Sequence, residues 1–358
     1  MDIKAHLKEI TELPGPSGYE MPVRDALAKV WQPLVDAVEN GKFNTLIATK
    51  YGAGAEPRPR IMLTAHIDEI AMIVNNVDSG VITIKALGGL DARTLPGTPV
   101  IVYGRQPIKG VIGLRPANRL TEAQKGKYPE LKDLIIDVGR SADEVASLVR
   151  IGDLVVADLP MMELENGRVA GKAMDDRSCI AAITAALDLL QSRKHSWDVI
   201  AFASVQEEAT LLGAEIGAKH LMPDVAIALD VTFGDQPGGG SPTFKLGAGP
   251  TLGIGPNFHP ALYDALQKTA ERLELTFHPE IAPGHSGTDA WPIQVAREGI
   301  PSALIGLATN NMHTTVETVE IKDIERIGRW LAEFVAELPA DFLTSLVWDK
   351  ETDEESKS

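Results

Sequence analysis

The pattern of apolar and polar residues changes near residue 170. From there to residue 338, apolar runs of strand length alternate with segments whose apolar residues recur at helical spacing. The pattern predicts, in order, helix 175–194, strand 198–205, helix 210–221, strand 224–231, helix 259–273, strand 275–281, helix 288–298, strand 300–307 and helix 321–338. Strands that alternate with helices form a sheet with helices on its faces.

The first half of the chain has a different pattern. Helical spacing near the N-terminus is followed by a strand-like segment at 60–74 and, up to about residue 168, by short strands and turns with one modest helix at 142–149. We therefore predict an α/β domain that is split in the sequence, formed by 1–69 and 170–348. A small β-rich domain is inserted at 70–169, and the acidic tail 349–358 is predicted to be disordered.

Composition and charge restrict the class of protein. A chain of 358 residues exceeds the usual size of a single core, and a net charge of −16 argues against binding to nucleic acid. The N-terminus "MDIKAHLKEI" has no apolar core of signal-peptide length, and no later apolar run is long enough to cross a bilayer. The single cysteine, Cys179, excludes an internal disulfide and a cysteine-rich metal site. We expect a cytoplasmic protein with no membrane or nucleic-acid partner.

Acidic and histidine residues gather at the predicted strand ends and helix starts. Ligands of open α/β sheets bind at the carboxyl ends of the strands, so these positions are candidates for function. They are His66 and Asp68 after the strand-like run "IMLTA", Asp175 and Asp176 at the start of helix 175–194, Glu207 and Glu208 after strand 198–205, Asp230 at the end of the run "VAIAL", and His313 after strand 300–307. Singly, each has a structural explanation as a cap or a solvated residue. Together they suit Zn²⁺ or Co²⁺ held by nitrogen and oxygen, with carboxylates free to bridge a second ion.

The adjacent carboxylates Glu207 and Glu208 suggest two roles. Neighbouring residues on an extended or turning backbone point in different directions, so Glu208 can reach a metal while Glu207 faces a water held by that metal. A carboxylate beside such a water can remove its proton and pass it to a leaving amine. In "HID", a spacing of two residues on a strand lets Asp68 accept a hydrogen bond from the non-ligating nitrogen of His66.

Six segments of the chain carry a resemblance to a known family. They are "HIDEI", "GKAMDDRSCIAA", "VQEEATLLGA", the aspartate that closes "IALD", "GTDAWPIQVAREGIPSALIG" and "MHTTVETV", in the right order over nearly the whole length. The chain resembles the M42 family of co-catalytic metallopeptidases, the group of glutamyl, deblocking and tetrahedral aminopeptidases. The resemblance implies a zinc-peptidase-like mixed sheet between helices, with the insertion 70–169 forming a barrel-like dimerisation domain.

The resemblance also implies a role for each matching residue. His66 and Asp230 would hold one metal ion, Glu208 and His313 a second, and Asp175 would bridge the two, with a peptide bond after it that is often cis. Glu207 would be the general base and Asp68 the acid that orients His66. The implied enzyme carries two divalent ions per subunit, Zn²⁺ or Co²⁺. It removes N-terminal residues from peptides with metal-bound hydroxide as the nucleophile, and it forms a homo-oligomer, a dodecamer in many relatives.

Several alternatives stay open at this stage. They are an endoglucanase-type glycosidase built on the paired carboxylates, N-acyl deblocking or another amidohydrolase reaction on the same fold, a serine hydrolase using Ser286, Asp289 and His313, and a scaffold without chemistry. His285 and Asp289 flank the predicted site and are predicted to contact substrate. The preferred N-terminal side chain and the identity of the metal do not follow from the sequence.

Overall fold

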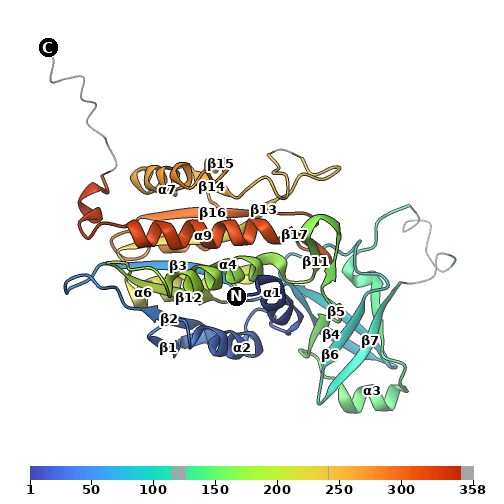
Figure 1. Cartoon of the computed structure of the whole chain (residues 1–358). Helices are drawn as coiled ribbons and strands as arrows, with labels where there is room; N and C mark the ends of the chain where they lie inside the picture. The colour runs from blue at the N-terminus through green and yellow to red at the C-terminus, as the bar shows by residue number, and fades with distance from the viewer. Residues whose placement is uncertain (115–117, 119–125, 241, 348–358) are drawn as a thin grey trace.

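The computed structural model describes residues 1–114, 118, 126–240 and 242–347, so the predicted acidic tail 349–358 lies outside the described residues. A large mixed sheet with helices on both faces lies beside a small closed barrel (Figure 1). This arrangement confirms the predicted α/β fold with a β-rich, barrel-like insertion. No helix in the described part of the chain combines the length and the hydrophobicity needed to span a membrane.

The large sheet has eight strands, and its centre is parallel. Across the sheet the strands are β1 (Ala37–Asn40), β2 (Leu46–Lys50), β12 (Asp198–Ser204), β3 (Arg60–His66), β13 (Val225–Phe233), β16 (Ser302–Thr309), β14 (Thr251–Ile254) and β15 (His278–Ile281). β12, β3, β13 and β16 run parallel, whereas β2 and β14 are antiparallel to their neighbours β12 and β16. The carboxyl ends of four adjacent strands therefore meet at one edge.

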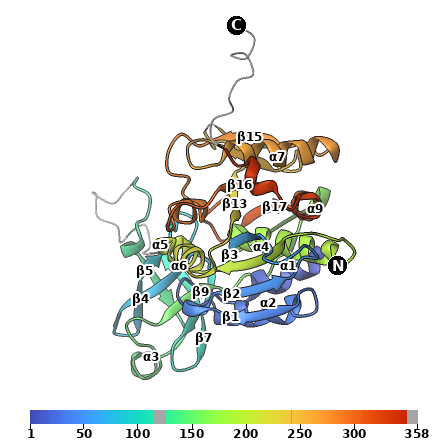
Figure 2. The same ribbon diagram turned by 90° about the vertical axis from the view of Figure 1, so that its left-hand side faces the viewer.

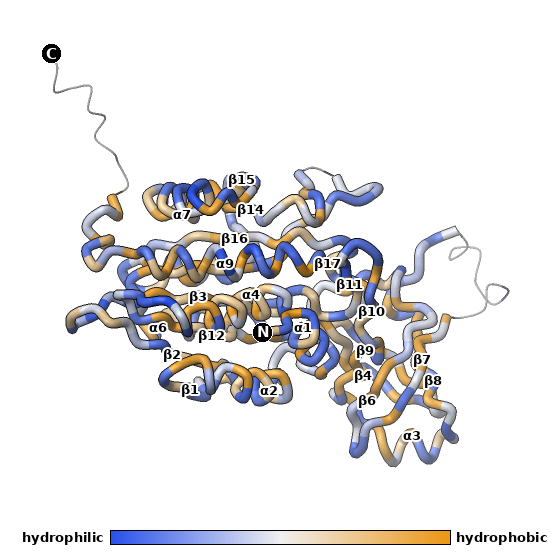
Figure 3. Tube along the Cα trace, viewed as in Figure 1, coloured by the Kyte–Doolittle hydropathy of each residue, from blue (hydrophilic) through white to orange (hydrophobic). Residues whose placement is uncertain are grey.

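Helices cover both faces of this sheet, as seen along the strands in Figure 2. They are α1 (Ile3–Glu12), α2 (Met21–Trp31), α4 (Met174–Leu190), α5 (Glu207–Thr210), α6 (Leu212–Leu221), α7 (Pro260–Arg272), α8 (Ala290–Gln294) and α9 (Ile321–Glu337). In β3, Ile61 and Leu63 belong to the core shared with α1, α4 and α9, and Met62 belongs to the core shared with α6 and α8. Alternate side chains of a strand thus serve opposite faces. Along α9, apolar and polar residues alternate at helical spacing (Figure 3), as expected for a helix with one face on the core.

The barrel has its own apolar core. Its strands are β4 (Ala71–Asp78), β5 (Val81–Leu87), β8 (Leu134–Asp137), β7 (Pro107–Leu114), β6 (Pro99–Tyr103) and β9 (Leu154–Ala157), closed in that order, with α3 (Ala142–Leu148) packed against β4. A separate sheet joins β10 (Met162–Glu163), β11 (Arg168–Gly171) and β17 (Glu317–Glu320). Residues 162–163 of the predicted insertion therefore pair with β11, whose other neighbour β17 precedes α9, and they are not part of the barrel. The domain boundaries 1–69, 70–169 and 170–348 stay predictions.

Several predicted elements were wrong in extent, among them helix 175–194, which ends at Leu190, and strand 275–281, which begins at His278. The strand-like segment 60–74 is two strands, because the chain leaves the large sheet after His66 and enters the barrel at Ala71. Helix 288–298 is only Ala290–Gln294. Asp230 does not end its strand, since β13 pairs with β16 as far as Phe233. Apolar patterning reports burial, and it does not report where one sheet ends and the next begins.

Candidate metal centre

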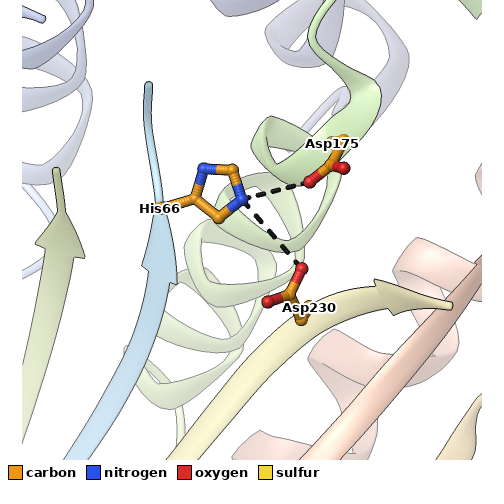
Figure 4. Close-up of side chains that lie close together, drawn as sticks. All are labelled: His66, Asp175 and Asp230. Carbon is orange, nitrogen blue, oxygen red and sulfur yellow. Dashed lines mark hydrogen bonds and ion pairs between the residues drawn. The ribbon is translucent and has the colours of Figure 1, made fainter. Parts of the chain in front are cut away.

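The first group of candidate ligands joins three elements at the edge where the parallel strands end. His66 is the last residue of β3, and its Nε2 lies 3.0 Å from Oδ1 of Asp175 and 4.0 Å from Oδ1 of Asp230 (Figure 4). Asp230 belongs to β13, the parallel neighbour of β3, and Asp175 to the first turn of α4. All three side chains are buried. The ligand atoms of the group lie within 4.8 Å of one another, which is close enough for one ion to contact all three.

A second group shares Asp175 with the first. Nε2 of His313 lies 3.4 Å from Oδ2 of Asp175 and 3.7 Å from Oε2 of Glu208. The ligand atoms of Asp175, Glu208 and His313 again lie within 4.8 Å of one another. Because the two oxygens of Asp175 face different histidines, this carboxylate is placed to bridge two ions. The peptide bond between Asp175 and Asp176 is cis.

The electrostatics of these side chains fit a bound cation. Oε1 of Glu208 is buried and has no hydrogen-bond partner within the described residues. Burial, together with the nearby Asp175 carboxylate, raises the pKa of Glu208 to about 10, and burial and Asp175 likewise hold the pKa of Asp230 well above its ordinary value. The chain by itself therefore disfavours charge on these two carboxylates. Divalent ions would supply the missing positive charge, and the histidine and carboxylate donors suit Zn²⁺ or Co²⁺.

Asp68 has the opposite surroundings. Its carboxylate accepts hydrogen bonds from the Ser17 hydroxyl at 2.5 Å and from the amides of Glu207 and Glu208 at 3.1 and 3.2 Å. Nδ1 of His66 lies 3.4 Å from Oδ1 of Asp68 and 3.2 Å from its carbonyl oxygen. Burial alone would raise the pKa of Asp68, but these contacts lower it. Asp68 lies just beyond β3, yet it still faces the nitrogen of His66 that points away from Asp175.

The backbone at residues 206–208 separates the two adjacent glutamates. Gln206 has a left-handed φ of 56°, and the short helix α5 begins at Glu207. Oε2 of Glu207 lies 3.7 Å from Nε2 of His66, whereas Glu208 points to the group that contains His313. Burial raises the pKa of Glu207 to about 10. Glu207 therefore lies beside the candidate ligands, as a proton carrier must.

Glu317 is a site residue that the sequence reasoning missed. Its buried carboxylate accepts hydrogen bonds from the Asp175 amide at 3.0 Å and the His313 amide at 2.9 Å. It thus fixes the backbone of two candidate ligands that are far apart in the sequence. The segment "MHTTVETV" contained this residue, but nothing in the sequence alone separates a buried clamp from an ordinary strand residue.

A cavity of about 290 Å³ opens onto this centre. Asp175, Glu207, Asp230 and His313 line it. The segment 286–288 also lines the cavity, but His285 and Asp289, the predicted substrate contacts, are absent from the lining. The exposed ring of His285 lies 4.4 Å, centroid to centroid, from that of Trp291, and Asp289 is buried. Their substrate roles stay predictions without support from this geometry.

The side chains do not have the geometry that the alternative hypothesis of a serine hydrolase requires. The hydroxyl of Ser286 shares a 3.0 Å hydrogen bond with the Thr288 hydroxyl. Nε2 of His313 faces Asp175 and Glu208 instead of the serine. A nucleophilic serine needs its base within hydrogen-bond reach, so these contacts do not form a triad.

Comparison with known proteins agrees with the fold. Residues 44–329 match the family model described as M42 glutamyl aminopeptidase. The lysyl aminopeptidase of Pyrococcus furiosus is 33% identical over 344 residues, which cover 94% of this chain and 98% of that protein. The matches to the family model and to this relative both extend across the α/β part and the barrel.

Solved structures show the same architecture. A TET aminopeptidase from a Thaumarchaeota archaeon of marine sediment is 29% identical, with a TM-score of 0.90 over 97% of this chain and 100% of that one. The TET1 peptidase of Pyrococcus horikoshii, described as assembling into a tetrahedron or a large octahedral shell, is 27% identical, with a TM-score of 0.81 over 94% of this chain and 100% of that one. The chain belongs to the M42 family of peptidases and is a hydrolase of the aminopeptidase class.

Proposed function

We propose that this chain is a dinuclear, metal-dependent aminopeptidase that removes the N-terminal residue of peptides. The observation that carries the proposal is the pair of ligand groups that share Asp175, with Asp175, Asp230 and His313 lining one cavity. His66 and Asp230 would hold one ion, Glu208 and His313 the other, and Asp175 would bridge them. Bound there, two Zn²⁺ or Co²⁺ ions would polarise the scissile carbonyl and lower the pKa of a coordinated water.

The remaining site residues orient groups and transfer protons. Asp68 holds the imidazole of His66 through Nδ1, so that Nε2 faces Asp175 and Asp230. Glu207 lines the cavity without belonging to either ligand group, and it would take a proton from water and return it to the leaving amine. Glu317 keeps Asp175 and His313 in register through their amides.

We also propose a homo-oligomer, specifically a dodecamer, and a cytoplasmic location. The assembly described for the TET1 peptidase supports the oligomer. The single buried cysteine and the net charge of −16 are compatible with a reducing compartment and with the absence of nucleic-acid binding. Light scattering of the purified protein tests the assembly directly, because a dodecamer has twelve times the mass of the 38.4 kDa chain.

The proposed activity is tested with a panel of chromogenic substrates. Substrates with free N-terminal amino acids are assayed with the purified protein, after chelation, and after addition of Zn²⁺ or Co²⁺, and elemental analysis counts the ions per chain. We expect cleavage that disappears on chelation, returns with metal and accompanies two ions per chain. Activity that persists without metal would contradict the mechanism.

The same assay separates the alternatives. An N-acylated peptide and a β-glucan are included, with Glu207→Gln as the inactive control. Cleavage of the acylated peptide in preference to the free amine would indicate a deblocking amidohydrolase. Cleavage of the glucan alone would indicate a glycosidase and would leave the two histidines of the site without a role.

A further inference from the structure

One carboxylate that lines the cavity has no place in the metal centre. Glu280, in β15, lines the same 290 Å³ cavity as Asp175, Glu207 and Asp230. It belongs to neither of the two ligand groups. Its strand is at the edge of the large sheet, three strands away from β13, which carries Asp230. The side chain nevertheless reaches back across the sheet toward β13.

Two hydroxyl groups fix the Glu280 carboxylate in this position. The hydroxyl of Thr232, in β13, donates to Oε1 at 2.6 Å, and the hydroxyl of Thr251, in β14, donates to Oε2 at 2.6 Å. Both threonines are buried. Each carboxylate oxygen keeps a free acceptor position, so the group remains able to bind a cation. A carboxylate that is already oriented loses little conformational freedom on binding.

A glycine in the intervening strand makes room for this carboxylate. A Cβ at Gly306, in β16, would lie 2.1 Å from Oγ1 of Thr251 and 3.0 Å from Oε2 of Glu280. Gly306 pairs with Asp230 in the neighbouring strand. The Glu280 carboxylate therefore lies over the strand next to that of the candidate metal ligand, and neighbouring strands are only ~4.8 Å apart.

The rest of the cavity wall is largely apolar. Val231, Phe233, Ala282, Leu304 and Met312 contribute to it. Among the lining residues in the described part of the chain, none is lysine or arginine. No lysine or arginine of the described lining therefore neutralises Glu280, and Glu280 lies outside both groups of candidate metal ligands. An apolar wall with one carboxylate suits a side chain that has an aliphatic stem and a cationic head.

We propose that Glu280 is a specificity-determining residue that selects peptides whose N-terminal residue is lysine or arginine. The inference rests on the proposed aminopeptidase function and adds the substrate class. With the reacting carbonyl at the candidate metal centre, the side chain of the first residue would extend along the apolar wall to Glu280. An N-terminal aspartate or glutamate is repelled by the same carboxylate.

The sharpest test compares two substrates that differ only at the end of the side chain. Lysine and norleucine p-nitroanilides share the four-carbon stem, and only lysine carries the ammonium group. We expect the wild type to cleave the lysine substrate with a kcat/KM roughly 30-fold or more above that of norleucine, because removing one partner of a desolvated charge pair has about this effect. In Glu280→Gln the ratio of the two kcat/KM values is expected to fall toward one. The reason is that kcat/KM falls for the lysine substrate and stays the same for the norleucine substrate.

Two further variants complete the design. Glu271→Gln, an exposed residue of α7, is the matched control and is expected to keep the wild-type ratio. Glu280→Lys is expected to reverse the preference toward a glutamate substrate. Circular dichroism and metal content establish that each variant is folded and loaded.

The outcomes separate this inference from the function on which it rests. If Glu280→Gln lowers kcat/KM equally for the lysine and norleucine substrates, the inference is overturned. That result would mean that Glu280 binds the α-ammonium group of every substrate or supports the fold. A wild type that cleaves norleucine as well as lysine would also overturn it while leaving the aminopeptidase function intact. If the wild type cleaves no free-amine substrate, the proposed function fails, and the inference fails with it.

Discussion

Two buried carboxylate clusters lie side by side in this protein, and they differ in where their positive charge comes from. Glu69 lies 2.8 Å from Nζ of Lys172 and 3.2 Å from a guanidinium nitrogen of Arg177. In the candidate metal centre, the carboxylates of Asp175, Glu208 and Asp230 form ion pairs only with histidines within the described part of the chain. The same two segments, 66–69 and 172–177, contribute to both clusters. Within the described residues the chain supplies lysine and arginine to one cluster, and the other is the cluster proposed to bind metal ions.

The Glu69 cluster has a structural role that also supports the site. Lys172 and Arg177 donate to the carbonyl oxygen of Leu13 at 3.0 and 2.7 Å, and the Gly15 amide donates to Glu69 at 2.9 Å. These bonds hold the loop that carries Ser17, whose hydroxyl donates to Asp68. Burial lowers the pKa of Lys172 to about 8, although Glu69 opposes this shift. The Glu69 cluster, whose charge the chain itself neutralises, thus supports the neighbouring site without belonging to it.

The largest expected effect separates Glu208, which is proposed to bind metal, from its neighbour Glu207, which is proposed to act as the general base. Glu207→Gln is expected to lower kcat by roughly 10²–10⁴-fold, the usual contribution of a general base, while the protein keeps two ions per chain. Glu208→Gln, the matched variant, is expected to lose metal. Assays of kcat with elemental analysis of both variants provide the measurement. Loss of metal from Glu207→Gln would move this residue into the ligand set.

Breaking the internally neutralised cluster tests the other half of the comparison. Glu69→Gln is expected to reduce the free energy of unfolding by about 3–5 kcal/mol, because it leaves Lys172 and Arg177 as buried cations without their anion. Glu163→Gln removes an exposed ion pair with Lys4 and is expected to change stability by less than ~1 kcal/mol. Urea unfolding of the two variants supplies the numbers. Similar values for both would show that burial of the Glu69 cluster contributes nothing.

A pH dependence is expected from Glu20, a buried carboxylate that belongs to neither group of candidate metal ligands. Burial raises its pKa from 4.5 to about 7, although the amides of Gly18 and Gln206 donate to Oε1. The folded protein binds this proton more tightly than the unfolded chain does. The resulting contribution to the free energy of unfolding is therefore fully present below pH 4.5 and is lost as pH rises through about 7. Glu20→Gln mimics the protonated form and is expected to gain roughly 3 kcal/mol over the wild type between these limits. Thermal unfolding across this range at constant metal loading measures it, and a pH-independent difference would contradict the assignment.

The smallest expected effect concerns the clamp on the ligand backbone. In Glu317→Gln only one side-chain oxygen remains. The two amides of Asp175 and His313 each donate to a separate oxygen of Glu317, so one of them loses its acceptor. We expect metal affinity to fall by about 10–100-fold, as for other groups that orient ligands, with kcat restored once the site is saturated. Competition with a chelator measures the affinity, and Glu325→Gln on the exposed side of α9 is the control. Unchanged affinity would reduce Glu317 to a packing residue.

Part of the site could be predicted from the sequence because its residues stand at recognisable boundaries. His66 ends a strand, the acidic residues of the other boundaries lie in the first turn of a helix, and Asp230 lies in a strongly apolar strand; those acidic residues are Asp175, Glu207 and Glu208. Glu317 and Glu280 could not be found in this way. Their roles depend on which strands become neighbours: β17 joins β11, and β15 joins the sheet through β14. Strand pairing between distant segments leaves no periodic signal in either strand.

The amino-acid sequence by itself determined the α/β class, the barrel-like insertion and the set of residues that the resemblance assigns to the metal centre. Local periodicity records which side chains are buried, and motifs record chemistry that needs particular residue types. The tertiary structure decided that the two oxygens of Asp175 face different histidines, that Glu69 meets Lys172 and Arg177, and that the space above Gly306 admits Glu280. These facts depend on distances between segments far apart in the chain, and only the packed sheet and its helices set those distances.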